Sequence, residues 1–216
     1  MNRKDVEVLC KQLAAEHPGW EYQSHIFKNK SLAHSEIWID PSWVLHLSAE
    51  PHLVIYNHSV NKVVKESLNV GKIWTVFMPI LSPDAHNNSM IYRELVHTLP
   101  DAEAYIRDFF QRGLDLVERY FYSEDEKIFL SSYPIVGEFP TPSTKFGYED
   151  LGNCMARAIL LDFEYVQKYI DNELPTPIYL PIHESVKESL KEWLPIWKQR
   201  AAETGSILKP TKKRGA

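Results

Sequence analysis

Hydrophobic residues recur at helical spacing in several stretches of the chain. The pattern predicts a first helix over residues 3–16, which ends at the breakers His17-Pro18-Gly19. The broadest apolar stripe covers residues 99–122 and follows a start signal, Thr98-Leu99-Pro100-Asp101. Three more helical regions are predicted, over residues 124–131, 148–172 and 183–203. Within the second of these, Asp162 is expected to cap the second half of a helical hairpin.

Between residues 20 and 81 the pattern changes to short runs of aromatic and β-branched residues, separated by turn-forming residues. These runs predict strands over residues 21–28, 32–39, 43–49, 52–58 and 73–81. Residues 57–61 are interpreted as a turn, because they are rich in Asn and Ser. Since the connections are too short for helical crossovers, the strands are predicted to form an antiparallel sheet.

The order of these elements predicts an α+β fold, with an N-terminal helix, an antiparallel sheet of four to five strands, and a C-terminal set of four to five packed helices. The chain has 216 residues, of which 44% are hydrophobic, and this is enough for one core. A single domain is expected over residues 1–204, with a sheet part at about 20–81 and a helical part at about 90–204. Two tightly fused subdomains are the alternative. Residues 205–216 are predicted to form a flexible basic tail.

Charge is distributed unevenly between this tail and the rest of the chain. The net charge is −5, but 4 of the 24 basic residues are Lys209, Lys212, Lys213 and Arg214 in the tail. The other 20 basic residues stand against 29 acidic ones, which gives the body a charge of −9. An acidic body repels phosphate backbones, so nucleic-acid binding is not expected except through the tail, which is interpreted as a solvated terminus rather than a binding arm.

Other features of the sequence favour a cytoplasmic protein. No apolar run reaches the length of about 18 residues that predicts a membrane span. The charged N-terminus lacks the apolar core of a secretory signal, and two cysteines cannot build a disulfide framework. We therefore expect no membrane association and a reducing compartment.

The common catalytic and cofactor motifs are missing from the sequence. It contains no glycine-rich phosphate loop, Gly-x-Ser-x-Gly elbow, His-Glu-x-x-His pair or Cys-x-x-Cys motif. Cys10 and Cys154 fall on the apolar side of predicted helices and are interpreted as structural thiols. No catalytic residue and no cofactor is predicted, and a binding protein is expected rather than an enzyme.

Histidines are dense in the predicted sheet and support an alternative hypothesis. His34 and Glu36 are two residues apart, so in a strand their side chains would point to one face. Joined by His46 from a neighbouring strand, they could bind Zn²⁺ or another divalent metal. Scattered surface histidines are the simpler interpretation. The alternative function is a metal-dependent or small-molecule enzyme that uses His34, Glu36 and His46.

Acidic residues on the predicted 99–122 helix and just after it are the remaining signal. They lie largely outside the apolar stripe and comprise Asp101, Asp108, Asp115, Glu118, Glu124, Asp125 and Glu126. A solvated helix face explains them. The alternative is a binding surface for a basic protein partner, because complementary charge speeds association and selects the partner.

The order of elements also resembles that of a known group of proteins. Together with Asp101-Ala-Glu-Ala-Tyr-Ile-Arg-Asp-Phe-Phe and Leu151-Gly-Asn-Cys-Met-Ala-Arg-Ala-Ile-Leu-Leu-Asp-Phe-Glu-Tyr-Val, it is similar to small uncharacterised bacterial proteins. Some of these resemble immunity proteins of polymorphic toxin systems. The resemblance implies a non-enzymatic cytoplasmic inhibitor that neutralises a cognate toxin, such as a basic toxin domain, by occluding it with an acidic surface. No residue role is carried over.

Overall fold

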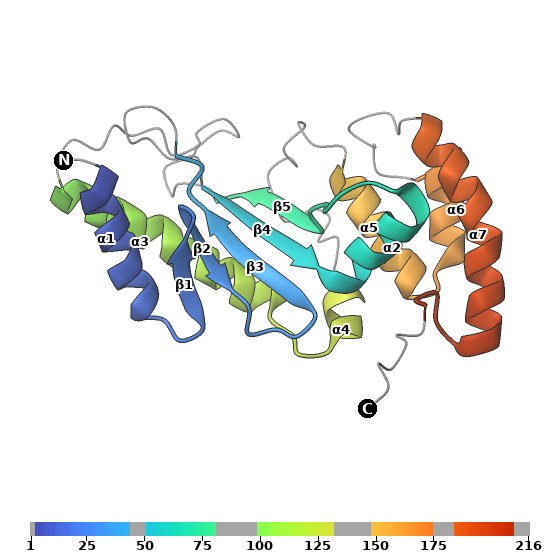
Figure 1. Ribbon diagram of the computed structural model, residues 1–216, viewed down its shortest axis with the longest axis horizontal. Helices are drawn as coiled ribbons and strands as arrows, with labels where there is room; N and C mark the ends of the chain where they lie inside the picture. Colours follow the sequence, from blue (N-terminus) through green and yellow to red (C-terminus); the bar gives the residue numbers. More distant parts are fainter. Residues whose placement is uncertain (1–2, 44–50, 81–98, 132–147, 175–183, 210–216) are drawn as a thin grey trace. The chain divides into compact units, whose positions relative to one another are not determined.

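The computed structural model describes residues 3–43, 51–80, 99–131, 148–174 and 184–209 (Figure 1). The chain divides into two compact units, which are described separately. The first unit comprises Met1–Tyr56 and Val76–Ser143, and the second comprises Asn57–Thr75 and Thr144–Ala216. The boundary between the units therefore does not follow the predicted division into a sheet part and a helical part. The single domain stays a prediction.

The first unit contains most of the sheet. Its elements are α1 (Arg3–Ala15), β1 (Trp20–Gln23), β2 (Ile26–Asn29), β3 (Ser35–Asp40), β4 (His52–Asn57), β5 (Val76–Pro79), α3 (Leu99–Leu116), the π-helical turn η2 (Val117–Phe121) and α4 (Glu126–Ser131). The second unit contains α2 (His58–Leu68), α5 (Tyr148–Ile159), α6 (Phe163–Asp171) and α7 (Glu184–Thr204). The predicted α+β fold class is confirmed: an N-terminal helix, a five-stranded antiparallel sheet and several C-terminal helices.

The sheet is a meander in which the strands lie in sequence order from β1 to β5 (Figure 1). Alternation along β3 buries Ser35, Ile37 and Ile39 and leaves the residues between them half-buried. Phe27 of β2 pairs with Ile39, so these two side chains share the buried face. Helix α3 packs closely on this face, because a Cβ added at Gly113 would lie 2.5 Å from Cδ1 of Ile39.

The predicted strand over residues 21–28 is wrong, because the structure has a hairpin there. Ser24 and His25 turn the chain with φ values of 55° and 65°, and Gln23 pairs with Ile26 across the turn. Two consecutive positive φ angles are typical of a tight hairpin turn, which Asn-Gly usually forms. The absence of glycine at Ser24-His25 concealed this turn in the sequence. Most of the predicted strand over residues 43–49 lies outside the described residues.

The predicted turn at residues 57–61 is also wrong, because α2 begins there. The side chain of Asn57 accepts a hydrogen bond from the backbone N–H of Val60 at 2.8 Å and so caps the helix. Helix α2 lies in the connection between β4 and β5, so this connection is long enough for a helix, contrary to the prediction. Its buried residues Val60, Val63 and Val64 are β-branched, a residue type with lower helix propensity, and no helix was predicted here.

Helices of the second unit pack on each other and on the segment before β5. Asp162 caps α6 as predicted, and its side chain accepts from the N–H of Tyr165 at 3.1 Å. A Cβ added at Gly152 of α5 would lie 3.0 Å from the backbone oxygen of Trp74, so the helix approaches backbone directly. Trp193 and Trp197 of α7 pack on each other, with ring centroids 6.3 Å apart.

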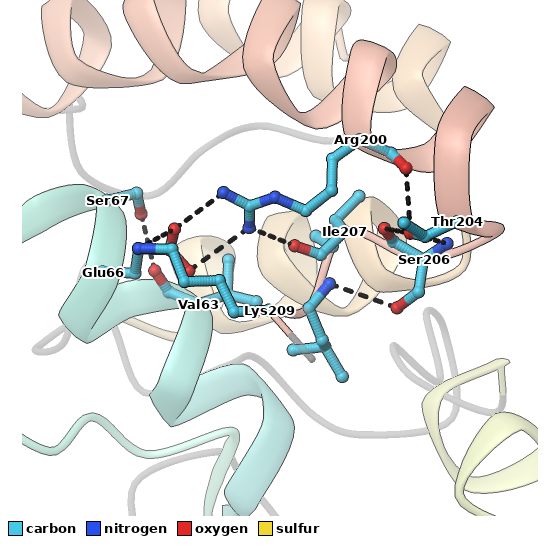
Figure 2. A network of polar contacts seen from close by, with 9 residues as sticks. Val63, Glu66, Ser67, Arg200, Thr204, Ser206, Ile207 and Lys209 are labelled. Atoms are coloured by element: carbon cyan, nitrogen blue, oxygen red, sulfur yellow. Dashed lines mark hydrogen bonds and ion pairs between the residues drawn. The ribbon is translucent and has the colours of Figure 1, made fainter. Parts of the chain in front are cut away.

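The segment after α7 packs on the second unit, although residues 205–216 were predicted to be flexible. Ile207 is only 1% exposed, and its backbone oxygen accepts a hydrogen bond from Arg200 at 2.5 Å (Figure 2). Lys209 forms an ion pair with Glu66 of α2 at 2.9 Å. One buried isoleucine in a basic stretch gives no periodic pattern, which is why the sequence did not indicate this contact. Residues 210–216 lie outside the described residues.

Candidate protein-binding surface

The predicted acidic residues all lie in the first unit, on α3, on η2 and at the start of α4. Asp101, Asp115 and Glu118 are exposed, whereas Asp108 is half-buried. Nε of Arg112 donates to both carboxylate oxygens of Asp108, at 3.2 and 3.0 Å. Part of the predicted acidic surface is therefore neutralised by a neighbouring residue, which the sequence analysis did not consider.

Other polar residues of α3 also donate hydrogen bonds to carboxylates. Arg107 donates to Glu103 at 2.9 Å and to the two oxygens of Glu16 at 2.7 and 2.9 Å. The hydrogen bond from Arg107, assisted by its positive charge, lowers the pKa of the Glu16 carboxyl. Gln111 donates to Asp115 at 2.8 Å and leaves the charge of that carboxylate intact. The solvent side of α3 is consequently mixed in charge rather than uniformly acidic.

The turn between η2 and α4 carries the highest local density of acidic residues. Glu124 and Asp125 are exposed, and Glu126 is half-buried. Asp125 accepts a hydrogen bond from the N–H of Lys127 at 2.7 Å, so this carboxylate also caps α4. Tyr122 and Ile128, which flank the acidic residues in the sequence, are 57% and 58% exposed. We call residues 122–128 the acidic turn.

His34 connects the acidic turn to the sheet. Its Nε2 lies 2.8 Å from the backbone oxygen of Ser123, and its Nδ1 lies 2.8 Å from the hydroxyl of Ser35. Because a carbonyl oxygen only accepts, Nε2 carries the proton and donates it. The imidazole is buried and packs on Phe129 of α4, with ring centroids 5.2 Å apart. One buried imidazole thus links the acidic turn to the residue that begins β3.

The same contacts bear on the alternative metal site. Strand β3 begins at Ser35, so His34 lies before the strand and the alternation that paired it with Glu36 does not apply. Both imidazole nitrogens of His34 make hydrogen bonds within the protein. His46 lies outside the described residues. In the part of the chain that the structure describes, no three His, Cys, Asp or Glu side chains are grouped so that they could hold a metal ion.

The two cysteine side chains are buried, as the helical pattern predicted. Burial raises the pKa of Cys10 to about 12, against a smaller lowering by a hydrogen bond with Tyr22. Burial also raises the pKa of Cys154. Both thiols are therefore protonated at neutral pH, and protonated thiols are poor nucleophiles.

The structure brings together one pair that the sequence analysis missed, Ser42 and His52. The hydroxyl oxygen of Ser42 lies 3.3 Å from Nδ1 of His52. The two residues are ten positions apart, with no periodic pattern between them, and Ser42 lies in the predicted connection between the strands over residues 32–39 and 43–49. Proximity of this kind is visible only after the chain has folded.

Comparison of the chain with protein families, with curated proteins and with solved structures finds no match. Among the described helices, none combines the length and the apolar character needed to cross a membrane. The candidate surface therefore has to be judged from its own geometry.

Proposed function

We propose that the chain is an immunity-type inhibitor, which binds a cognate basic toxin through the acidic surface of its first unit. One observation carries this proposal. The acidic turn presents the exposed carboxylates of Glu124 and Asp125 between the exposed side chains of Tyr122 and Ile128, and His34 links it to the sheet.

This arrangement combines two properties of protein interfaces. Carboxylates attract a basic partner from a distance and speed its association, particularly at low salt. An exposed tyrosine and an exposed isoleucine provide apolar area for the centre of the contact, where aromatic residues are enriched. A turn fixed by His34 also loses little conformational entropy on binding. The exposed acids Asp101, Asp115 and Glu118 add to the same charge.

The proposal is tested with the product of the reading frame adjacent to this gene as the candidate toxin. The test variant is Glu118→Lys with Glu124→Lys, which leaves the capping residue Asp125 intact. We expect its association rate constant to fall at least about tenfold at low salt, since charge complementarity governs the association rate. Stopped-flow mixing at two salt concentrations measures this constant.

A matched control reverses two acids of the other unit. Glu188 and Glu192 of α7 are exposed, so Glu188→Lys with Glu192→Lys changes the net charge equally. We expect this control to bind within about twofold of the unaltered protein, apart from a general charge effect. Equal slowing by both variants would assign the effect to net charge alone. Absence of a complex between the unaltered chain and the neighbouring gene product would contradict the proposed function itself.

A further inference from the structure

Ser42 and His52 of the first unit have the geometry of a nucleophile and its base. Ser42 follows β3, and His52 is the first residue of β4. The Ser42 hydroxyl lies 3.3 Å from Nδ1 of His52, a distance within the range that such pairs show before a substrate binds. Both side chains are half-buried.

Two contacts fix the positions of these side chains. Ser42 has a φ of 45°, a left-handed conformation that is unfavourable for a residue with a Cβ. A carboxylate oxygen of Asp40 holds it there by accepting a hydrogen bond from the Ser42 N–H at 2.8 Å. The imidazole of His52 stacks on Phe77 of β5, with centroids 4.5 Å apart and planes at 26°. The hydroxyl and the imidazole therefore meet in a defined orientation.

We propose that Ser42 is a nucleophile that His52 activates as a general base, and that the pair reacts with esters of small acyl groups. This inference does not rest on the proposed function. In the first step, the proton of the Ser42 hydroxyl moves to Nδ1 of His52 while the bond from Oγ to the acyl carbon forms. The bond from that carbon to the leaving oxygen breaks, and the leaving alcohol takes the proton from His52.

Water completes the cycle. It gives a proton to His52 as its oxygen attacks the acyl carbon, and the bond to Ser42 Oγ breaks. Ser42 recovers its proton from His52, and a carboxylic acid is released. Each step conserves atoms and charge, and water is the only further reactant.

The experiment treats the full chain with phenylmethylsulfonyl fluoride, which forms an Oγ–S bond with an activated serine and releases fluoride. Intact-mass measurement gives the rate at which the adduct forms, and peptide mapping identifies the residue that carries it. We expect one adduct, on Ser42, and its formation should slow about 100-fold or more in His52→Gln, because general-base assistance contributes roughly this factor. Release of p-nitrophenol from p-nitrophenyl acetate should depend on both residues in the same way.

Ser24 provides an internal control in the same unit. It also has a positive φ and is also next to a histidine, but Nδ1 of that histidine, His25, lies 3.3 Å from a carboxylate oxygen of Glu7. Ser24→Ala should leave the labelling unchanged. Labelling of Ser42 no faster than that of Ser24 in the unaltered protein would overturn the inference, and this comparison needs no variant to fold. Equal rates for His52→Gln and the unaltered chain would also overturn it.

Discussion

The two units differ in the kind of contact that joins their helices to neighbouring elements. In the first, α3 meets the sheet through side chains: at Gly113 the nearest atoms belong to Ile39 and Ile80, and the ring of Phe110 packs against Phe27 at 4.4 Å. In the second, α5 meets backbone at Gly152. A charged side chain, Glu66, also joins α2 to α7 and to the C-terminal segment there (Figure 2).

This difference predicts how each unit responds to substitution. An apolar contact between side chains can be relieved by shortening one of them. A contact with a backbone atom cannot be relieved in this way, because a substitution does not remove the backbone atom. When one member of a half-buried charge pair is removed, the other charge remains without its partner. The second unit should therefore tolerate less change at its junctions than the first.

The largest effect is expected at Ile207, in the segment that the sequence analysis assigned to a flexible tail. Ile207→Ala removes a side chain that is almost fully buried, which should lower the free energy of unfolding by about 2–4 kcal/mol. Val8→Ala, at an exposed position of α1, should change it by less than about 0.5 kcal/mol. Denaturant titration measures both values. A cost for Ile207→Ala as small as that for Val8→Ala would mean that the segment does not pack in solution.

The next largest effect is expected at Glu66. This carboxylate accepts from Arg200 and Lys209, each at 2.9 Å, and both Glu66 and Arg200 are mostly buried. Glu66→Gln leaves Arg200 without its counter-charge and should cost about 1–3 kcal/mol at neutral pH. Glu103→Gln, which disturbs the exposed pair with Arg107, should cost at most about 0.5 kcal/mol.

Acid should abolish the difference between Glu66→Gln and the unaltered chain. Burial raises the pKa of Glu66, but the hydrogen bonds and positive charges of Arg200 and Lys209 outweigh it, so the pKa is lowered below the ordinary value of 4.5. A lowered carboxyl pKa stabilises the fold above the unfolded pKa, and this contribution is lost as the pH falls through the folded pKa. The difference in free energy of unfolding between the two proteins should therefore narrow as the pH falls below the ordinary carboxyl pKa of 4.5, which denaturant titration from pH 7 to pH 3 measures. Parallel curves would contradict this assignment.

Both units contain elements that the sequence predicted and elements that it did not. Local signals succeeded: a wide apolar stripe predicted α3, and Asp162 caps α6 as expected. Local signals failed where residue type and conformation disagree. The Ser24-His25 turn lacks glycine, and the Asn and Ser residues that predicted a turn at 57–61 cap and begin α2. Tertiary contacts decide such cases, and a pattern along the chain does not contain them.

The candidate surface was predicted in part. Its acidic residues are visible in the sequence, but the ion pair of Asp108 with Arg112 was not considered. The hydrogen bond from His34 to Ser123 joins residues 89 positions apart, and no spacing rule predicts it. The same holds for Ser42 and His52.

An effect smaller than those at Ile207 and Glu66 is expected at Gly113 of α3. Alanine is favoured over glycine in a helix by about 1 kcal/mol, but here its Cβ would overlap Ile39, and overpacking costs about 1–3 kcal/mol. Gly113→Ala should therefore be destabilising by about 1 kcal/mol. Adding Ile39→Val removes the Cδ1 atom that lies 2.5 Å from the new Cβ, and the double variant should be more stable than the sum of the single changes predicts.

Gly152→Ala in α5 is the matched test in the other unit. The nearest atoms there are backbone oxygens of Trp74 and Thr75, at 3.0 and 3.2 Å, so no side-chain substitution at those positions can relieve the contact. A double-mutant cycle by denaturant titration distinguishes the two cases. If the Gly113 and Ile39 changes were simply additive, the side-chain account of the first unit would be wrong.

The smallest effect is a gain in stability, and it concerns backbone strain that both units share. Leu161 joins α5 to α6 with a φ of 66° and is exposed, and the N–H of Asp162 donates to the oxygen of Arg157 at 2.9 Å across it. Glycine is usual at this position after a helix, because it lacks the Cβ that makes a left-handed conformation unfavourable. Leu161→Gly should raise the free energy of unfolding by about 0.5–1 kcal/mol.

Leu161→Ala separates backbone strain from side-chain exposure, since it removes the exposed side chain and keeps the Cβ. It should give little or no gain. In the first unit, His25 has a φ of 65°, so His25→Gly should stabilise to a similar degree. Thermal unfolding of the three variants beside the unaltered chain measures these shifts. A gain for Leu161→Ala equal to that for Leu161→Gly would assign the effect to the exposed leucine side chain and would remove strain as a feature common to the two units.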